Sequence, residues 1–143
     1  MAQLAAREHS TLRDCVRKLN DLYRTTAQFH GSDCERDGFR WVDLHNADES
    51  VWAFARRCAG RDAGPAITCV FNATPVPRDG YAIGVAEPGS YGKIFDSDDA
   101  RFGGSAYNRQ SEVHAVQEGA QGYPCSLRLN LPPLAAMFFI GPA

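Results

Sequence analysis

The stretch CVFNATPVPRDGYAIGV, residues 69–85, decides the fold of this chain. A strand-like run, CVFN, meets two prolines and a charged Arg-Asp-Gly segment, and a second strand-like run then begins. Proline fixes φ and donates no backbone hydrogen bond, so Pro75 and Pro77 make this connection stiff. Arg78 and Asp79 are either functional residues of a site or simply polar residues of a turn.

The same alternation of strand-like runs and turn residues continues on both sides of this stretch. Short runs rich in aromatic and β-branched residues alternate with clusters of Gly, Pro, Asn and Asp, which is typical of an antiparallel sandwich or barrel. We predict a mainly β fold, an antiparallel β-sandwich of about eight strands, at residues 38–43, 50–57, 66–72, 80–85, 91–96, 112–117, 126–131 and 134–140.

One amphipathic helix precedes the strands, and we predict it at residues 7–29. Its apolar positions recur with helical period at Leu12, Cys15, Val16, Leu19, Leu22 and Tyr23. Ser10 or Thr11 is the expected cap and Gly31 the expected end. We divide the chain into a helical unit, 1–30, and a sandwich domain, 31–143. The apolar stripe must be buried against the sandwich or against a partner outside the chain.

The bulk composition excludes several classes of function. The chain has 143 residues and a net charge of −2, which fits one domain without a nucleic-acid or membrane partner. No signal-peptide core is visible, so we expect a cytoplasmic location. The number of cysteines, five, is odd, and no two of them form a CxxC pair. We therefore expect free thiols that are buried.

No residues form a recognisable catalytic or metal-binding motif, so we predict no catalytic residue, no metal and no cofactor. Six acidic residues lie in turns, where they cap backbone N–H groups: Asp43, Asp48, Glu49, Asp96, Asp98 and Asp99. The segment FDSDDARFGG, 95–104, lacks the final glutamate and the flanking helices of an EF-hand. The histidines have no HExxH spacing, and the glycines form no phosphate-binding loop.

The aromatic residues divide into two groups. Trp41, Trp52 and Phe54 fall within predicted strands, and we expect them in the core. Phe102 and Tyr107 lie in a glycine-containing loop. They are the candidate ligand contacts, since aromatic rings can stack on sugars.

Five segments, taken together, resemble bacterial 1,4-α-glucan branching enzymes of the α-amylase superfamily. The segment 8–30 is similar to the last helix of the catalytic barrel in that family, through LNDLYR. The others are similar to its C-terminal domain: GFRWVDLHNADESVWAFARR (38–57), FNATPVPRDGYAIGV (71–85), FDSDDARFGGS (95–105) and SLRLNLPPLAA (126–136). The five occur in the family's order and spacing and cover about residues 8–139.

The resemblance implies a role in glycogen biosynthesis as a C-terminal all-β domain. In the family, a (β/α)8 barrel transfers α-1,4 glucan segments to α-1,6 branch points by a retaining glycosyltransferase mechanism. Its aspartate nucleophile, glutamate acid/base and supporting aspartate lie upstream of the matched region, so this chain alone is expected to be inactive. The stiff stretch would then join two sandwich strands, with Arg78–Gly80 as the turn, and the barrel would be the partner of the helix.

Two departures from the family pattern are visible. Met1 comes only seven residues before the matched helix, and Arg101 and Phe102 stand where the family more often has an acid and a tyrosine. The chain is therefore a shortened gene, an isolated piece or a free-standing descendant.

Two functions follow, and both remain open. The chain is a non-catalytic domain that braces the barrel and helps to hold glucan, with Phe102 and Tyr107 as the glucan contacts. The alternative is a free-standing glucan-binding module. A small enzyme is the weakest hypothesis, because no convergent acid pair is apparent. We also expect self-association through the helix face formed by Leu12, Val16, Leu19 and Tyr23.

Overall fold

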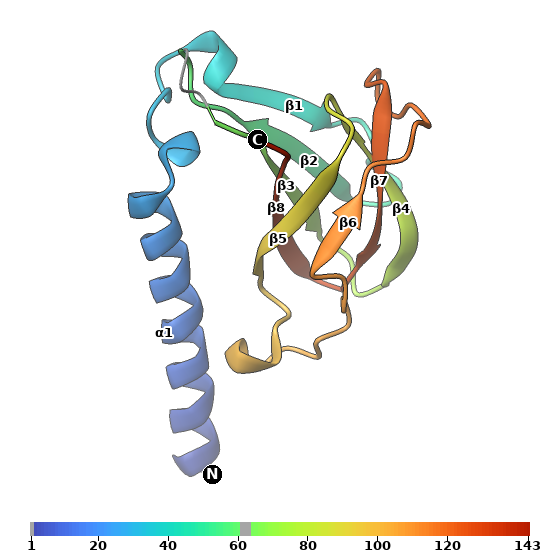
Figure 1. Cartoon of the computed structure of the whole chain (residues 1–143). Helices are drawn as coiled ribbons and strands as arrows, with labels where there is room; N and C mark the ends of the chain where they lie inside the picture. Colours follow the sequence, from blue (N-terminus) through green and yellow to red (C-terminus); the bar gives the residue numbers. More distant parts are fainter. Residues whose placement is uncertain (1, 61–63) are drawn as a thin grey trace.

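A computed structural model describes residues 2–60 and 64–143, the first seven of them, 2–8, as backbone alone. The chain forms helix α1 (Ala2–Thr25), two short 3-10 turns, η1 (Ala27–Phe29) and η2 (Arg36–Gly38), and then the strands. Figure 1 shows α1 running along one side of the sandwich instead of lying flat on a sheet. The predicted helix followed by a mainly β domain is confirmed.

Helix α1 begins earlier than we predicted. It includes Ala2, so Ser10 and Thr11 lie inside the helix and do not cap it. The preceding residues, AQLAARE, are mostly good helix formers and extend the helix toward the N-terminus. The helix also ends at Thr25, before Gly31, because η1 turns the chain toward the sandwich.

In the described residues, 2–60 and 64–143, eight strands form two antiparallel sheets, as we predicted. They are β1 (Phe39–Asp43), β2 (Val51–Arg56), β3 (Ile67–Asn72), β4 (Arg78–Val85), β5 (Ser90–Asp96), β6 (Glu112–His114), β7 (Cys125–Leu131) and β8 (Ala135–Ile140). The larger sheet has the order β1-β2-β3-β8-β5-β6, and β4 pairs with β7 in the smaller one.

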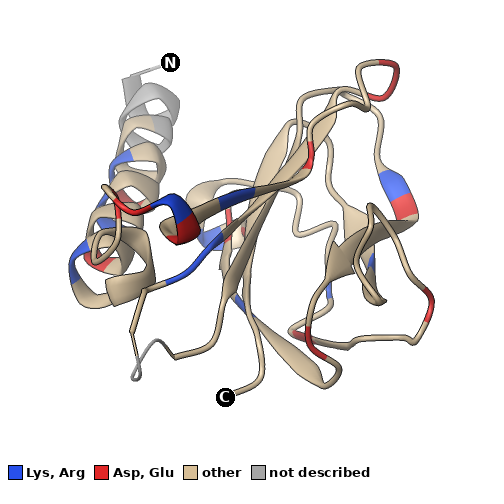
Figure 2. Ribbon diagram, turned by 90° about the horizontal axis from the view of Figure 1, so that it is seen from above, with Lys and Arg blue, Asp and Glu red and all other residues tan. Residues whose placement is uncertain are grey.

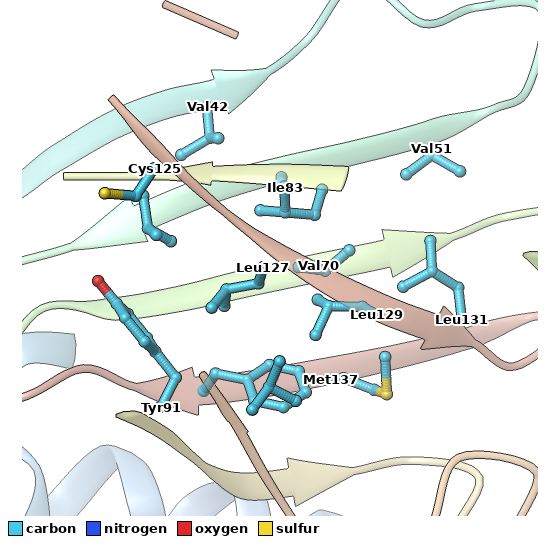
Figure 3. Close-up of a cluster of buried hydrophobic side chains, with 14 residues drawn as sticks. Val42, Val51, Val70, Ile83, Tyr91, Cys125, Leu127, Leu129, Leu131 and Met137 are labelled. Carbon is cyan, nitrogen blue, oxygen red and sulfur yellow. The ribbon is translucent and has the colours of Figure 1, made fainter. Parts of the chain in front are cut away.

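The core lies between the two sheets and is mostly aliphatic (Figure 3). Alternate residues of the large sheet, including Val51, Val70 and Met137, face Ile83 and Leu127 of the small sheet. Leu127 is fully buried. Burying a leucine of this kind stabilises the fold by about 1.5–3 kcal/mol.

The stiff stretch at residues 69–85 crosses from one sheet to the other. Asn72, which is buried, donates to the carbonyls of Val76 and Pro132 at 2.9 Å each, while its Oδ1 accepts from the backbone N–H and the hydroxyl of Thr74. The linker between two strands is confirmed, but the predicted turn at Arg78–Gly80 is wrong. Strand β4 already begins at Arg78, and an irregularity in its register between Arg78 and Tyr81 takes up Gly80, at φ 63°.

Candidate functional site

The outer face of the large sheet carries a continuous band of aromatic rings. We define this aromatic face as Phe39, Trp41, Trp52, Phe54, Phe71, Phe95 and Phe138. The rings of Trp52 and Phe71 stack with centroids 5.6 Å apart and planes 11° apart. Trp41, at the edge of the band, is 46% exposed.

Our expectation that Trp41, Trp52 and Phe54 lie in the core is wrong. In β2 the positions alternate, and the inner ones are the small residues Val51 and Ala53. The space between the sheets is already filled by the leucines of β7, so the bulky rings occupy the outer positions. A band of large apolar rings on an outer face is typical of an interaction surface.

Helix α1 and the aromatic face enclose an apolar groove of about 440 Å³. From the helix side it is lined by Leu19, Asn20, Leu22, Tyr23 and Phe29, and from the sheet side by Phe39, Phe54, Arg56, Cys69 and Phe138. Asn20, Arg56 and the hydroxyl of Tyr23 are the polar groups of this lining. On the rest of the helix, Leu12 is 64% exposed and Val16 47%.

Arg56 ties the helical segment to the sheet. Its guanidinium donates to the carbonyls of Gln28, at 3.3 Å, and Phe29, at 2.9 Å, and forms an ion pair with Asp33. Gln28 donates in turn to the carbonyl of Pro65 at 3.0 Å. The ring of Phe29 packs on that of Phe138, with centroids 5.7 Å apart.

The two candidate ligand contacts lie in one loop but have different surroundings. Phe102 is half-buried against Phe95, with ring centroids 6.0 Å apart, and the Arg101 guanidinium lies over its ring. Tyr107 is 38% exposed, and its hydroxyl donates to the carboxylate of Asp79 at 2.8 Å. That hydrogen bond raises the pKa of Tyr107. Tyr107 is therefore the more accessible ring.

Asp98 organises this loop by accepting hydrogen bonds across it. Its carboxylate accepts from the backbone N–H and hydroxyl of Ser105, at 2.7 Å each, and from the N–H of Tyr107 at 2.9 Å. Burial alone would raise the pKa of Asp98, but these three hydrogen bonds and the charge of Lys93 lower it below its ordinary value. Asp99 caps the N–H of Arg101 in the same loop. The prediction that these acids cap backbone groups is confirmed for both.

Asp43 and Glu49 belong to a polar network at the start of the small sheet. The hydroxyl of Tyr81 donates to Asp43 at 3.0 Å, and Asn46 donates to both Tyr81 and Glu49. Arg78 forms an ion pair with Glu49 at 2.8 Å. Burial, together with Asp43, raises the pKa of Tyr81 to about 12. Asp43 and Glu49 thus hold strands together, and Arg78 is an anchor of β4.

Asp96 lies in a second, buried polar cluster. Its carboxylate pairs with Lys93 at 2.8 Å and accepts from the N–H of Asp98. Lys93 donates also to the carbonyl and side chain of Asn108, and Asn108 donates to the carbonyl of Asn130 at 2.6 Å. Asp48 lies exposed in the turn before β2. These contacts account for Asp96 as a structural residue.

In the part of the chain that the structure describes, no group of three or more His, Cys, Asp or Glu residues is placed to hold a metal ion. All five cysteines are free, but only Cys69 and Cys125 are buried, so the expectation of buried thiols holds for two. Figure 2 shows both signs of charge interspersed over the ribbon. Within residues 2–60 and 64–143, helix α1 is too polar to span a bilayer.

The fold defines an accessory all-β domain, and its outer face carries the band of aromatic rings. Residues 41–140 match the family model described as "Alpha amylase, C-terminal all-beta domain", and the chain belongs to that family. Among curated relatives, it is similar to the 1,4-alpha-glucan branching enzyme GlgB of Thiobacillus denitrificans, with 40% identity over 92% of this chain. It is similar to that of Rubrobacter xylanophilus, with 43% identity over 92%, and of Burkholderia vietnamiensis, with 39% over 94%.

The chain corresponds to a small part of each of these relatives. It spans 17% of the Thiobacillus denitrificans protein and 18% of the other two. The resemblance read from the sequence is confirmed at the level of the domain. The activity of the whole branching enzyme is a property of those proteins.

Proposed function

We propose that this chain is the non-catalytic C-terminal domain of a 1,4-α-glucan branching enzyme, and that it braces the catalytic barrel. The observation that carries the proposal is the aromatic face, which with helix α1 encloses an apolar groove. A protein surface that exposes large apolar patches normally buries them against a partner. The barrel would supply that partner, and the five free thiols fit the reducing cytoplasm as its compartment.

The chemistry of the groove favours a protein partner over a sugar. A glucan presents hydroxyl groups, and each one that is buried without a hydrogen bond weakens binding by about 1–3 kcal/mol. The lining of the groove is apolar apart from Asn20, Arg56 and the hydroxyl of Tyr23, and the described hydrogen bonds of Arg56 go to its own chain. An apolar helix surface would lose no such hydrogen bonds.

A chimera tests the bracing role in an intact enzyme. This chain would replace the matching segment of the Thiobacillus denitrificans branching enzyme, and formation of α-1,6 linkages would be followed by NMR. We expect an active chimera whose thermal midpoint falls when Phe54 or Phe71 is changed to serine. Arg128→Ser, an exposed position on the small sheet, is the matched control and should leave the midpoint unchanged. An unstable chimera that is indifferent to Phe54 and Phe71 would overturn the proposal.

Glucan binding is the second candidate function, and Phe102 and Tyr107 are its proposed contacts. Its support is the exposed ring of Tyr107 beside the carboxylate of Asp79, since a stacking ring next to a hydrogen-bonding group suits a sugar. Native affinity electrophoresis of this chain in glycogen gels tests it. Retardation that Tyr107→Ala abolishes would establish a glucan-binding module, and equal mobility with and without glycogen would leave bracing as the function.

A further inference from the structure

Helix α1 is held to the rest of the chain at two places along its length. At its C-terminal end, the Phe29–Phe138 contact and the bonds of Arg56 fix η1 to the sheet. Further toward the N-terminus, α1 contacts the 3-10 turn η3 (Ala100–Phe102), and a Cβ added to Gly103 would lie 3.3 Å from Thr11 Oγ1. Thr11 and Thr25 are separated by about 21 Å along a helix.

The segment that reaches Thr11 is closed tightly on itself. We define the Asp98 loop as residues 97–107, and its hub is the carboxylate that accepts from Ser105 and Tyr107. Backbone bonds add to it, from Ala106 N to Asp98 O at 2.8 Å and from Gly104 N to Asp99 O at 3.2 Å. A Cβ at Gly104 would lie 2.2 Å from the Asp98 carbonyl, so the closure needs glycine there.

The loop is also anchored to the sandwich at its base. The buried Lys93–Asp96 pair and Asn108 flank the loop at its two ends, and Asn108 reaches the carbonyl of Asn130 on β7. The ring of Phe102 rests on Phe95 of β5. In Figure 1 the loop after β5 extends from the sandwich toward the middle of α1. A rigid element therefore joins the sheet to the helix far from the η1 attachment.

We propose that the Asp98 loop is a strut, and that it fixes the position of helix α1 relative to the sandwich. Asp98 is the positioning residue of the strut. The strut and the η1 attachment together keep the groove open in the free chain, so a partner meets a groove that is already formed. This inference concerns the chain alone and holds whatever occupies the groove, so its failure would leave the bracing role untouched.

Loss of the strut should release one half of the helix. In proteins, most of the stability of a helix comes from the tertiary packing of its amphipathic face, so a half that loses its contacts opens more readily. With only η1 attached, the turns around Thr11 would open more often, while the turns before Thr25 would stay held. The expected effect is local, which separates it from a general loss of stability.

Amide hydrogen exchange of the full chain tests the strut. In Asp98→Asn, which keeps the size of the side chain, we expect exchange at residues 9–16 to rise at least tenfold. Residues 20–25 and the core strands should change only by the factor that global unfolding imposes. Gly103→Val places a branched side chain at φ 86° and toward Thr11, so it should strain the loop at its contact with α1 and give the same local pattern while the Asp98 carboxylate is retained.

A remote variant is the control. Asn46→Ala removes bonds to Tyr81 and Glu49 in the other polar network, so it should lower stability without singling out residues 9–16. The proposal is overturned if protection at residues 9–16 is unchanged in both Asp98→Asn and Gly103→Val. It is equally overturned if the Asn46→Ala pattern is indistinguishable from theirs.

Discussion

Gln121 closes the free edge of β4 with its side chain, and its replacement should both destabilise the chain and expose that edge. Its Oε1 accepts from Gly84 N at 2.7 Å, and its Nε2 donates to Ala82 O at 3.0 Å, with a third, longer bond from Nε2 to Asp43 at 3.4 Å; the first two bonds join it to β4. Ala82 and Gly84 alternate with the residues of β4 whose backbone faces β7, so one amide group stands in for a residue of a third strand. An unpaired strand edge is a template for pairing with another chain.

The size of the effect follows from these two bonds and from the backbone. Each hydrogen bond contributes about 0.5–1.5 kcal/mol, so Gln121→Ala should lower the free energy of unfolding by about 1–3 kcal/mol. Gln121 has φ 46°, in the left-handed region. That conformation costs a non-glycine residue about 1–2 kcal/mol. Gln121→Gly also loses both bonds but relieves this strain, so it should be more stable than Gln121→Ala by about 1 kcal/mol.

Urea unfolding followed by circular dichroism measures the stabilities, and size-exclusion chromatography with light scattering measures association. Gln117→Ala, at another exposed glutamine of the same connection, is the control and should behave like the unmodified chain. The reasoning fails if Gln121→Ala unfolds at the unmodified midpoint without associating, or if Gln121→Gly is the less stable of the two.

Three further outcomes follow from the polar contacts. Asn72→Ala should cost about 2–4 kcal/mol of unfolding free energy in urea titrations, because it removes the donor to the carbonyls of Val76 and Pro132 and the acceptor for the N–H and hydroxyl of Thr74. Thr74→Ala, which removes only the hydroxyl bonds to Asn72 Oδ1 and Val76 O, should cost less. Because the pKa of Asp98 is lowered in the fold, its carboxylate stabilises the folded chain fully above about pH 4, and this contribution is lost as the pH falls through the native pKa. The difference in unfolding free energy between the unmodified chain and Asp98→Asn should therefore shrink below about pH 4. A constant difference would contradict the assignment. The pKa of Tyr81 is raised to about 12, so its neutral hydroxyl stabilises the fold below about pH 10, and this contribution is lost as the pH rises toward 12. Tyr81→Phe should therefore reduce the fall of unfolding free energy with pH in alkaline solution. An unchanged slope would argue against the Tyr81–Asp43 bond.

The positions of the strands were predictable from the sequence because their signals are local. Runs such as ITCVFN and AAMFFI combine high strand propensity with flanking Gly, Pro or Asn, and strands lie where these runs occur. The direction of the side chains was not predictable in the same way. Alternation assigns Val51 and Trp52 to opposite faces, but only the packing against Leu127 and Leu129 decides which face is inner.

The candidate site is formed by contacts between residues far apart in the sequence, so most of it could not be predicted from the sequence. Nothing near Phe138 in the sequence indicates that it meets Phe29 and Phe71, because the three come from η1, β3 and β8. Small residues at Ala53 and Ala55, which alternate with the rings of Trp52 and Phe54, were the available signal. They indicate an inner face with little room and hence an outer face that carries the rings. The turn expected at Arg78 is wrong because Arg78 pairs with Leu131 of β7 and already belongs to β4.

The order within the aromatic face bears on the kind of partner that it suits. The rings of Trp52, Phe54 and Phe71 are already stacked on one another in the free chain, so docking would immobilise few additional side-chain rotamers. Each rotamer that need not be frozen saves about 0.5–1.5 kcal/mol of binding free energy. A groove held open by η1 and the Asp98 loop would reduce this cost further. A pre-ordered apolar surface of this kind binds best to an equally rigid apolar surface, such as the outside of a helical layer, whereas a flexible glucan chain would bear its own ordering cost and leave hydroxyl groups unpaired.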